Sequence, residues 1–241
     1  MKPPIDGGTV LITGASSGIG LAIAKQLAGR AKALVLVARR RERLEALADE
    51  LRAAHGGLRV FVHACDLSDR SALDPLVDEV ERETGGVDIL VNNAGFGDMG
   101  VFDLTHWPKN ESMLNVNIFA LTYLTHRLAR PMVARGRGGI LNVGSTYGLS
   151  FTPGYATYIG TKHFVAGFSE SLRADLAGTG VAVTQLCPGP VKPSFSRCPG
   201  ISRPLTCRGS SRSRPSAARG TRSAVSNAGA RASSPAGSSA S

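Results

Sequence analysis

The feature that most constrains the fold of this 241-residue chain is the stretch Thr9 to Leu27, TVLITGASSGIGLAIAKQL. It opens with an apolar run typical of a strand buried on both faces in a parallel sheet. Three glycines follow, Gly14, Gly18 and Gly20, where the backbone needs unusual dihedral angles and a close approach to a ligand. Apolar residues then recur at helical spacing. The stretch therefore predicts a strand and a helix joined by a turn that leaves room for a phosphate group at the helix N-terminus.

A glycine-rich turn can also hold no ligand, because three glycines alone are a weak signal. The next segment favours a dinucleotide. Residues 32–38, KALVLVA, indicate a second buried strand, and Arg39 and Arg40 follow it directly. At this place a dinucleotide-binding fold recognises the adenosine ribose, and an acidic residue would bind the 2′-hydroxyl. Arginine there instead predicts NADP(H) rather than NAD(H), with Arg39 as a contact, whereas Arg41 and Arg43 are interpreted as the solvated first turn of the next helix.

Strand and helix patterns alternate along the following hundred residues. Strand-like runs occupy 58–63, 88–91 and 139–143, and helical spacing occupies 44–51, 73–80 and 114–133. This alternation predicts a single α/β domain, a Rossmann-type doubly wound parallel sheet in three α/β/α layers. Ligands bind such sheets beyond the carboxyl ends of the strands. The residues expected at those ends are Asp66, Asn92, Gly95 and Ser145.

The positive charge of the chain is concentrated near its C-terminus. The formal net charge is +10, and residues 196–241 contain eight arginines and no acidic residue. The only large aliphatic residues of this segment are Ile201, Leu205 and Val225, which offer too little apolar area to offset chain entropy. We therefore expect a folded domain over residues 1–195 and a disordered low-complexity tail over residues 196–241.

Several classes of protein and site are disfavoured by the sequence. Because no apolar run approaches the ~20 residues needed to span a bilayer, and residues 1–8 lack the apolar core of a signal peptide, a cytoplasmic location is expected. The four cysteines and five histidines show no metal-ligand spacing, so no metal site is expected. The basic tail could bind nucleic acid through phosphate charge, but it has no interleaved aromatic residues for stacking.

Tyr158 and Lys162 are four residues apart and would share one face of a helix. Reduction of a carbonyl by a nicotinamide requires a proton donor, and a phenol can serve if its pKa is lowered toward neutrality. A fixed ammonium group and a positive nicotinamide ring have the right sign to lower it. Ser145 can hydrogen-bond the substrate oxygen, and Asn117 is expected to hold a water that connects Lys162 to solvent.

Each of these residues also has a plainer interpretation. A Tyr–Lys pair can lie on a helix surface, a serine can cap a strand end, and an asparagine can lie on a helix surface. Tyr147 and Tyr155 are alternative acids, although neither is followed by a lysine four residues later. The joint occurrence of the set in one predicted cofactor-binding frame favours catalysis. Trp107 and Met113 are interpreted as packing residues.

With these residues in place, the chain resembles the short-chain dehydrogenase/reductase family over about residues 8–192, and more narrowly its bacterial ketoacyl-reductase-like members. The matching motifs, in the family's order, are TGASSGIG at 13–20, Asp66-Leu67, NNAG at 92–95, Asn117, Ser145, Tyr158-x-x-x-Lys162 and PGPV at 188–191. The resemblance implies cofactor phosphates at Gly14, Ser16, Gly18, Ile19 and Gly20, adenine at Asp66, and the adenine ribose beside Asn93, Ala94 and Gly95. The further cofactor-binding positions that it implies are Ser17, Leu67, Tyr158, Lys162, Pro188, Gly189 and Val191.

The chain departs from the family's pattern after PGPV. The family usually places a threonine two residues on, at the nicotinamide carboxamide, whereas here Lys192 is followed by Pro193 and Ser194. A proline offers neither an amide hydrogen nor a hydroxyl. The family's later elements, a substrate-covering segment, a helix and a last strand with oligomer contacts, are not recognisable in residues 196–241, which favours a frameshift or truncation.

Two functions remain open at this point. The first is an NADP(H)-dependent oxidoreductase that transfers hydride between nicotinamide and a carbonyl or secondary alcohol, with tyrosine as acid/base, in a homo-oligomer weakened by the missing elements. The second is a cofactor-binding remnant with impaired catalysis.

Overall fold

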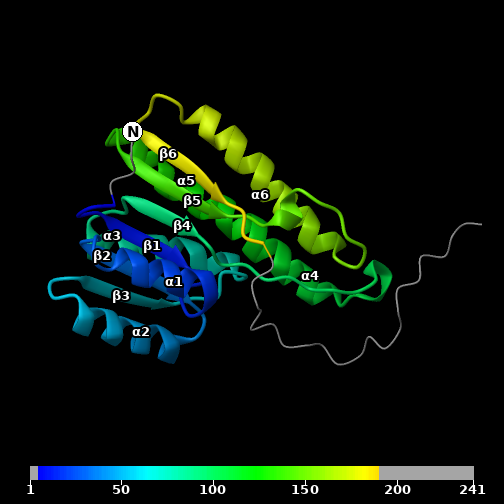
Figure 1. Ribbon diagram of the computed structural model, residues 1–241, viewed down its shortest axis with the longest axis horizontal. Coiled ribbons are helices and arrows are strands. Elements are labelled where there is room, and N and C mark those ends of the chain that lie inside the picture. Colours follow the sequence, from blue (N-terminus) through cyan, green and yellow to red (C-terminus); the bar gives the residue numbers. More distant parts are fainter. Residues whose placement is uncertain (1–4, 190–241) are drawn as a thin grey trace, which may run out of the picture. The chain divides into compact units, whose positions relative to one another are not determined.

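The structure, a computed structural model that describes residues 5–189, is built on a six-stranded parallel sheet (Figure 1). The strands are β1 Thr9–Thr13, β2 Ala33–Ala38, β3 Arg59–Ala64, β4 Ile89–Asn92, β5 Gly138–Val143 and β6 Val181–Leu186. The α-helices are α1 Gly18–Leu27, α2 Arg41–Ala54, α3 Leu73–Thr84, α4 Trp107–Leu114, α5 Leu121–Ala134 and α6 Ala156–Asp175. A π-helical segment, η3 Asn115–Ala120, joins α4 to α5, and short 3-10 turns are η1 Arg70–Ala72, η2 Phe102–Leu104 and η4 Thr146–Gly148.

The order of the strands places a crevice at the centre of the sheet. The order is β3-β2-β1-β4-β5-β6, so the chain runs outward from β1 to β3 and then crosses to β4 on the other side of β1. At the carboxyl end of this central pair, Ile12 lies opposite Val91. Because the connections leave β1 and β4 in opposite directions, a crevice opens there that suits a ligand.

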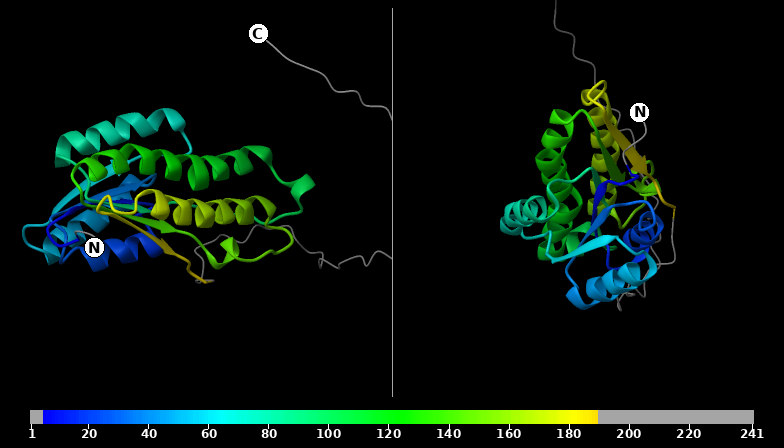
Figure 2. Two further views of the ribbon diagram at one scale, coloured as in Figure 1. Left: turned by 90° about the horizontal axis from the view of Figure 1, so that it is seen from above. Right: turned by 90° about the vertical axis from the view of Figure 1, so that its left-hand side faces the viewer.

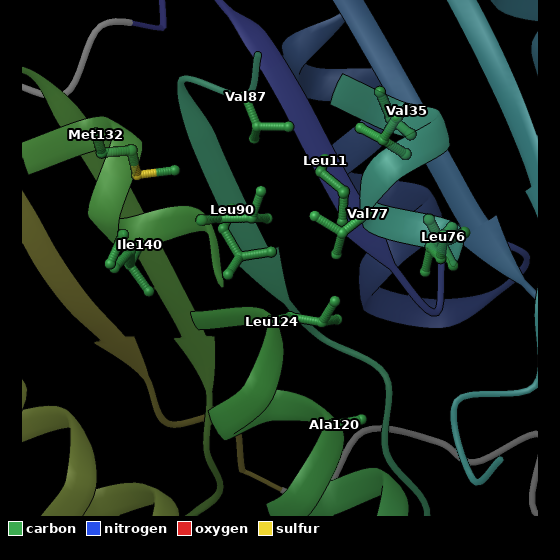
Figure 3. Close-up of a cluster of buried hydrophobic side chains, with 14 of the residues drawn as sticks. Leu11, Val35, Leu76, Val77, Val87, Leu90, Ala120, Leu124, Met132 and Ile140 are labelled. Atoms are coloured by element: carbon green, nitrogen blue, oxygen red, sulfur yellow. The ribbon is translucent and has the colours of Figure 1, made fainter. Parts of the chain in front are cut away.

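Helices cover both faces of the sheet, which explains why its central strands are continuous apolar runs. On β1, Val10 and Ile12 belong to the cluster that packs against α1 and α2, whereas Leu11 belongs to the cluster of α3 and α5. Figure 3 shows part of this second cluster, where Leu90 lies among side chains of α3 and α5 such as Leu124. Figure 2 shows the resulting layers from two further directions.

The predicted α/β fold is confirmed, with two differences in its elements. The helix predicted over 114–133 belongs to a longer helical run that begins at Trp107 and contains the π-helical segment. The strand β6 was not singled out by the sequence, because its apolar run covers only residues 181–183 before the polar Thr184 and Gln185. Met113 is buried as expected, but Trp107 is 60% exposed at the N-terminus of α4, so its interpretation as a packing residue is wrong.

Two further expectations concerned the C-terminal tail and membrane-spanning helices. The predicted tail, residues 196–241, lies outside the described residues. Within residues 5–189, no helix combines the length and apolar character needed to cross a membrane.

Candidate active site

The glycine-rich turn between β1 and α1 has the backbone conformation that its glycines predict. Gly14 and Gly18 have φ angles of 67° and 57°, which disfavour any residue with a Cβ. A Cβ on Gly14 would also lie 2.9 Å from the Cα of Ala94, and one on Gly20 would lie 2.5 Å from the Gly14 carbonyl oxygen. The turn therefore requires glycine for two reasons: its dihedral angles, and the close approach of the chain after β4 and of α1.

Side chains from β1 and the end of β4 hold this turn in place. The Asn93 side-chain amide donates to the carbonyl oxygens of Thr13, at 2.8 Å, and Gly14, at 3.3 Å. In return, the Thr13 hydroxyl accepts from the backbone N–H groups of Asn93, at 3.0 Å, and Ala94, at 2.9 Å. Asn93, which was predicted to contact the cofactor, thus has its amide group committed to the shape of the turn.

A cavity of about 530 Å³ opens beside the turn, at the carboxyl ends of the strands. The predicted cofactor-binding residues that line it are Gly14, Ser16, Ser17, Gly18, Ile19, Arg39, Asp66, Leu67, Asn93, Ala94, Gly95, Tyr158, Lys162, Pro188 and Gly189. Ser145 lines the same cavity, whereas Gly20 and Asn117 lie buried behind its wall. Val191 lies outside the described residues. The structure thus brings the glycine-rich turn and the predicted catalytic set to one space.

Three arginines at the start of α2 line one part of this cavity. They are Arg39, which was predicted, and also Arg40 and Arg43. The Arg40 guanidinium donates to the hydroxyl groups of Ser16 and Ser17, at 3.1 Å each, and is thereby tied to the glycine-rich turn. Arg43 is exposed in the first turn of α2, as expected, and it also lines the cavity.

Tyr158 and Lys162 lie one turn apart on α6, and both face the cavity. Lys162 is only 7% exposed, and its Nζ donates to the Val143 carbonyl oxygen at 2.9 Å and lies 5.9 Å from the centroid of the Tyr158 ring. Burial lowers the pKa of Lys162 to about 8, because removal from water disfavours the charged form.

The pKa of Tyr158 moves in the direction opposite to the one expected from the sequence. Burial of the phenol raises this pKa above its ordinary value of 10.0, and a hydrogen bond with Ser145 opposes the rise. The physical reason is that desolvation disfavours phenolate, while the ammonium of Lys162 is directed to the Val143 carbonyl rather than to the phenol oxygen. In the protein alone, therefore, Tyr158 is a half-buried neutral phenol.

Ser145 lies two residues after the end of β5 and caps the turn η4. Its hydroxyl accepts a hydrogen bond from the Tyr147 backbone N–H at 3.2 Å, which fixes the side chain at the strand end. Gly148 lets this turn pack on α6, since a Cβ there would lie 2.6 Å from the Lys162 carbonyl oxygen. The local geometry thus holds Ser145 beside the turn of α6 that carries Tyr158.

Asn117 lies in the π-helical segment, and its side chain forms hydrogen bonds with Phe96 and Thr161. Its Nδ2 donates to the carbonyl oxygen of Phe96, at 2.9 Å, and to the hydroxyl of Thr161, at 3.0 Å, while its Oδ1 accepts from the Phe96 N–H at 3.1 Å. Thr161 in turn donates to the Tyr158 carbonyl oxygen at 2.7 Å. Asn117 therefore ties the loop after β4 to α6, and the water link predicted for it stays a prediction.

Thr161 is the residue of this link that sequence reasoning missed. It is fully buried and stands directly before Lys162. A threonine three residues after a tyrosine in a helix is unremarkable by itself, because its hydroxyl commonly bonds a carbonyl of the preceding turn. Only the contact with Asn117, across 44 positions of sequence, shows that it joins two elements of the site.

The alternative acids are placed differently from Tyr158. Tyr147 and Tyr155 stack on each other with ring centroids 5.4 Å apart, and Tyr147 meets the Tyr158 ring edge-on at 5.9 Å. Of these three tyrosines, Tyr158 lines the cavity. Cys65 also lines it, but burial raises the pKa of its thiol to about 11, so it is a neutral thiol at pH 7.

The residues present suit a dinucleotide. The free N–H groups at the start of α1 point toward the turn, where a phosphate would be held. At Gly18, a Cβ would meet nothing within 4 Å, so the backbone there faces open space. Arginines at one part of the cavity and the Ser145, Tyr158 and Lys162 group at another match the two ends of such a molecule. Among residues 5–189, no cluster of three or more histidine, cysteine or acidic side chains could hold a metal ion.

Known proteins share this arrangement. Residues 8–198 match the family model described as short chain dehydrogenase. A sulfoacetaldehyde reductase of Chromohalobacter salexigens is 39% identical over 190 residues, covering 78% of this chain and 74% of the relative. The structure of a short-chain dehydrogenase from Sphingobium yanoikuyae in complex with NADPH matches with a TM-score of 0.71 and 39% identity, over 76% of this chain and 71% of that one.

An NAD⁺-bound xylitol dehydrogenase is also similar, with a TM-score of 0.71 and 30% identity over 77% of this chain and 71% of that one. The two structures hold different dinucleotides, so fold likeness alone does not select the cofactor. Together with the cavity and its motifs, these matches show that the chain belongs to the short-chain dehydrogenase family and is an NAD(P)-dependent oxidoreductase.

Proposed function

We propose that the chain transfers hydride between NADP(H) and a carbonyl or secondary alcohol substrate, with Tyr158 as the acid/base. The observation that carries this proposal is that Ser145, Tyr158 and Lys162 line the same cavity as the glycine-rich turn. The sulfoacetaldehyde reductase among the relatives supports reduction of a carbonyl, and the NADPH complex supports the cofactor.

The bound reduced nicotinamide supplies the hydride, and its oxidised form carries a positive ring. The hydride adds to the carbonyl carbon, and the developing alkoxide takes a proton from the Tyr158 hydroxyl. Ser145 donates a hydrogen bond to the same substrate oxygen and so orients it. Because Tyr158 is a neutral phenol in the protein alone, it starts with the proton that reduction consumes.

Lys162 contributes through its position and its charge. Its Nζ is buried next to the Tyr158 ring and bonded to the end of β5. Since its pKa is about 8, it carries charge at pH 7 and can stabilise a phenolate formed during turnover. Gly95 leaves room for the Asn117 side chain behind this group, because a Cβ there would lie 3.0 Å from the Asn117 Oδ1.

NADP(H) rather than NAD(H) is supported by the charge at the start of α2. Arg39, Arg40 and Arg43 line the cavity, and Arg40 is already anchored by two hydroxyl groups. A guanidinium group suits a phosphate because it offers several fixed donors and a permanent charge. These arginines would therefore stabilise the charged 2′-phosphate of NADP(H) more than the neutral 2′-hydroxyl of NAD(H).

The experiment measures dissociation constants for NADPH and NADH by fluorescence titration, together with NADPH oxidation on a panel of ketones and aldehydes. Arg39→Asp should reduce the preference for NADPH by about tenfold or more, as expected for the loss of a charge-assisted contact. Arg41→Asp is the matched control, because Arg41 pairs with Glu45 at 3.4 Å and does not line the cavity. NADH binding as tightly as NADPH, or an unchanged preference in Arg39→Asp, would contradict the assignment.

A further inference from the structure

Exposed apolar side chains gather on two loops near the candidate catalytic residues. Of the ten large hydrophobic residues that are exposed in the described part of the chain, seven lie within residues 99–107 and 149–151: Met99, Val101, Phe102, Leu104, Trp107, Leu149 and Phe151. We call this set the apolar rim. Single exposed hydrophobic residues are normal, but a concentration of this kind marks a binding surface.

The two loops meet each other beside Tyr158. The Gly100 N–H donates to the Gly154 carbonyl oxygen at 2.8 Å, which joins the connection before α4 to the connection before α6. Gly97 lies against the Tyr158 ring, since a Cβ there would be 3.0 Å from Cδ2. Figure 1 shows both connections extending beyond the sheet at the same end of the molecule, where α4 and α6 begin. The two loops that carry the apolar rim therefore reach the Tyr158 ring.

The charges of these loops disfavour an anionic ligand. Lys109 is paired with Asp98 at 2.6 Å, and the buried Lys162 donates to a backbone carbonyl. Asp103 lies between the rim residues Phe102 and Leu104 and is exposed. A carboxylate or sulfonate on the substrate would meet this negative charge and lose hydration, whereas a hydrocarbon would bury apolar surface.

We propose that the substrate is a ketone or aldehyde with an extended apolar body, which lies along the apolar rim while its carbonyl reaches Ser145 and Tyr158. This inference rests on the proposed function, because it takes Tyr158 as the point where the carbonyl binds. The rim then determines which carbonyl compounds are selected, and the Ser145, Tyr158 and Lys162 group performs the same reaction on each.

The first test is a homologous series with the full chain and NADPH. The substrates are 2-butanone, 2-hexanone and 2-octanone, and also 7-oxooctanoate, which has the carbon chain of 2-octanone with a terminal carboxylate. Values of kcat/KM should rise about twofold to fourfold per added CH₂ group that contacts the rim. The value for 7-oxooctanoate should be at least tenfold below that for 2-octanone. A flat series, or equal values for this matched pair, would overturn the inference.

Two rim variants locate the effect. Met99→Gln and Leu149→Asn keep the side-chain length and remove the apolar character, so each should flatten the dependence on chain length while leaving 2-butanone little changed. Val133→Gln is the control, since Val133 is 37% exposed on α5, outside the rim, and its series should match that of the unmodified protein. If the rim variants change only the melting temperature and not the series, the rim packs against protein, and the inference is wrong.

A binding measurement separates this inference from the proposed chemistry. The Tyr158→Phe variant, loaded with NADPH, is titrated calorimetrically with 2-octanone and with 7-oxooctanoate. If the unmodified protein reduces none of the ketones but this variant still binds 2-octanone at least tenfold more tightly, the chemistry fails and the substrate class stands. Equal or reversed affinities would overturn the substrate class whatever the activity.

Discussion

The glycine-rich turn and the catalytic group line the same cavity, but they are built in different ways. The turn is a continuous stretch, residues 13–20, and its function depends on backbone: positive φ angles at Gly14 and Gly18 and the absence of a Cβ at Gly20. The catalytic group consists of Ser145, which caps η4, and of Tyr158 and Lys162 from α6, with Asn117 and Thr161 behind them. The turn is therefore formed by one short stretch of sequence, whereas the catalytic group is brought together from distant segments by folding.

This difference decides what each region can control. Changes in the turn should act on cofactor affinity, because the turn is the proposed phosphate site and contains no acid or base. Changes around Tyr158 should act on the rate of the chemical step and leave cofactor affinity in place. The predictions below test that separation.

The largest effect on cofactor affinity is expected in the turn. Gly14→Ala places a side chain at a φ of 67° and 2.9 Å from the Ala94 Cα, so the turn must move. NADPH affinity should fall by about 100-fold, the scale of one to two displaced phosphate hydrogen bonds. Gly167→Ala is the matched control, because a Cβ on this exposed residue of α6 meets nothing within 4 Å. Unchanged NADPH affinity in Gly14→Ala, measured by titration, would show that the turn does not bind phosphate.

A smaller effect is expected behind the catalytic group. Thr161→Val preserves shape but removes the hydroxyl that joins Asn117 to the Tyr158 carbonyl. The value of kcat should fall about tenfold, in line with the loss of roughly 1 to 2 kcal/mol from one buried hydrogen bond, with the NADPH dissociation constant unchanged.

Thr161→Ser serves as the rescue variant, because it restores the hydroxyl without the methyl group. If Thr161→Val loses NADPH affinity and kcat together, the residue supports the whole fold rather than the position of Tyr158. If Thr161→Ser is as impaired as Thr161→Val, the hydroxyl is not the relevant group.

The regions also differ in how far sequence could predict them. The turn, the strands on either side of it and the position of Arg39 follow from local residue order, because each requirement falls within a few positions. The roles of Arg40 and Thr161 do not, since they depend on contacts across 23 to 44 positions. The raised pKa of Tyr158 was missed for a related reason: spacing places Lys162 on the same face, but only the structure shows its Nζ bonded to Val143.

The smallest expected effect is on stability. The pKa of Lys162 is about 8 in the folded protein and 10.5 in the unfolded chain, so the unfolded state binds more protons between these values and stability rises with pH. From pH 7 to pH 9, the free energy of unfolding of the cofactor-free protein should rise by roughly 1 kcal/mol relative to that of Lys162→Met. Urea denaturation of both proteins at the two pH values measures this difference. Parallel pH dependence in the two proteins would mean that Lys162 is not desolvated.

The most direct test of the account compares turnover and cofactor binding in Tyr158→Phe, with Tyr155→Phe as the control. The account predicts that Tyr158→Phe loses the transferable proton, so kcat falls by about 10² to 10⁴, while NADPH binds with an unchanged dissociation constant and Tyr155→Phe stays active. Comparable activity in Tyr158→Phe would contradict the assignment of the acid. An unmodified protein that binds NADPH but turns over no carbonyl would identify the chain as a cofactor-binding remnant instead.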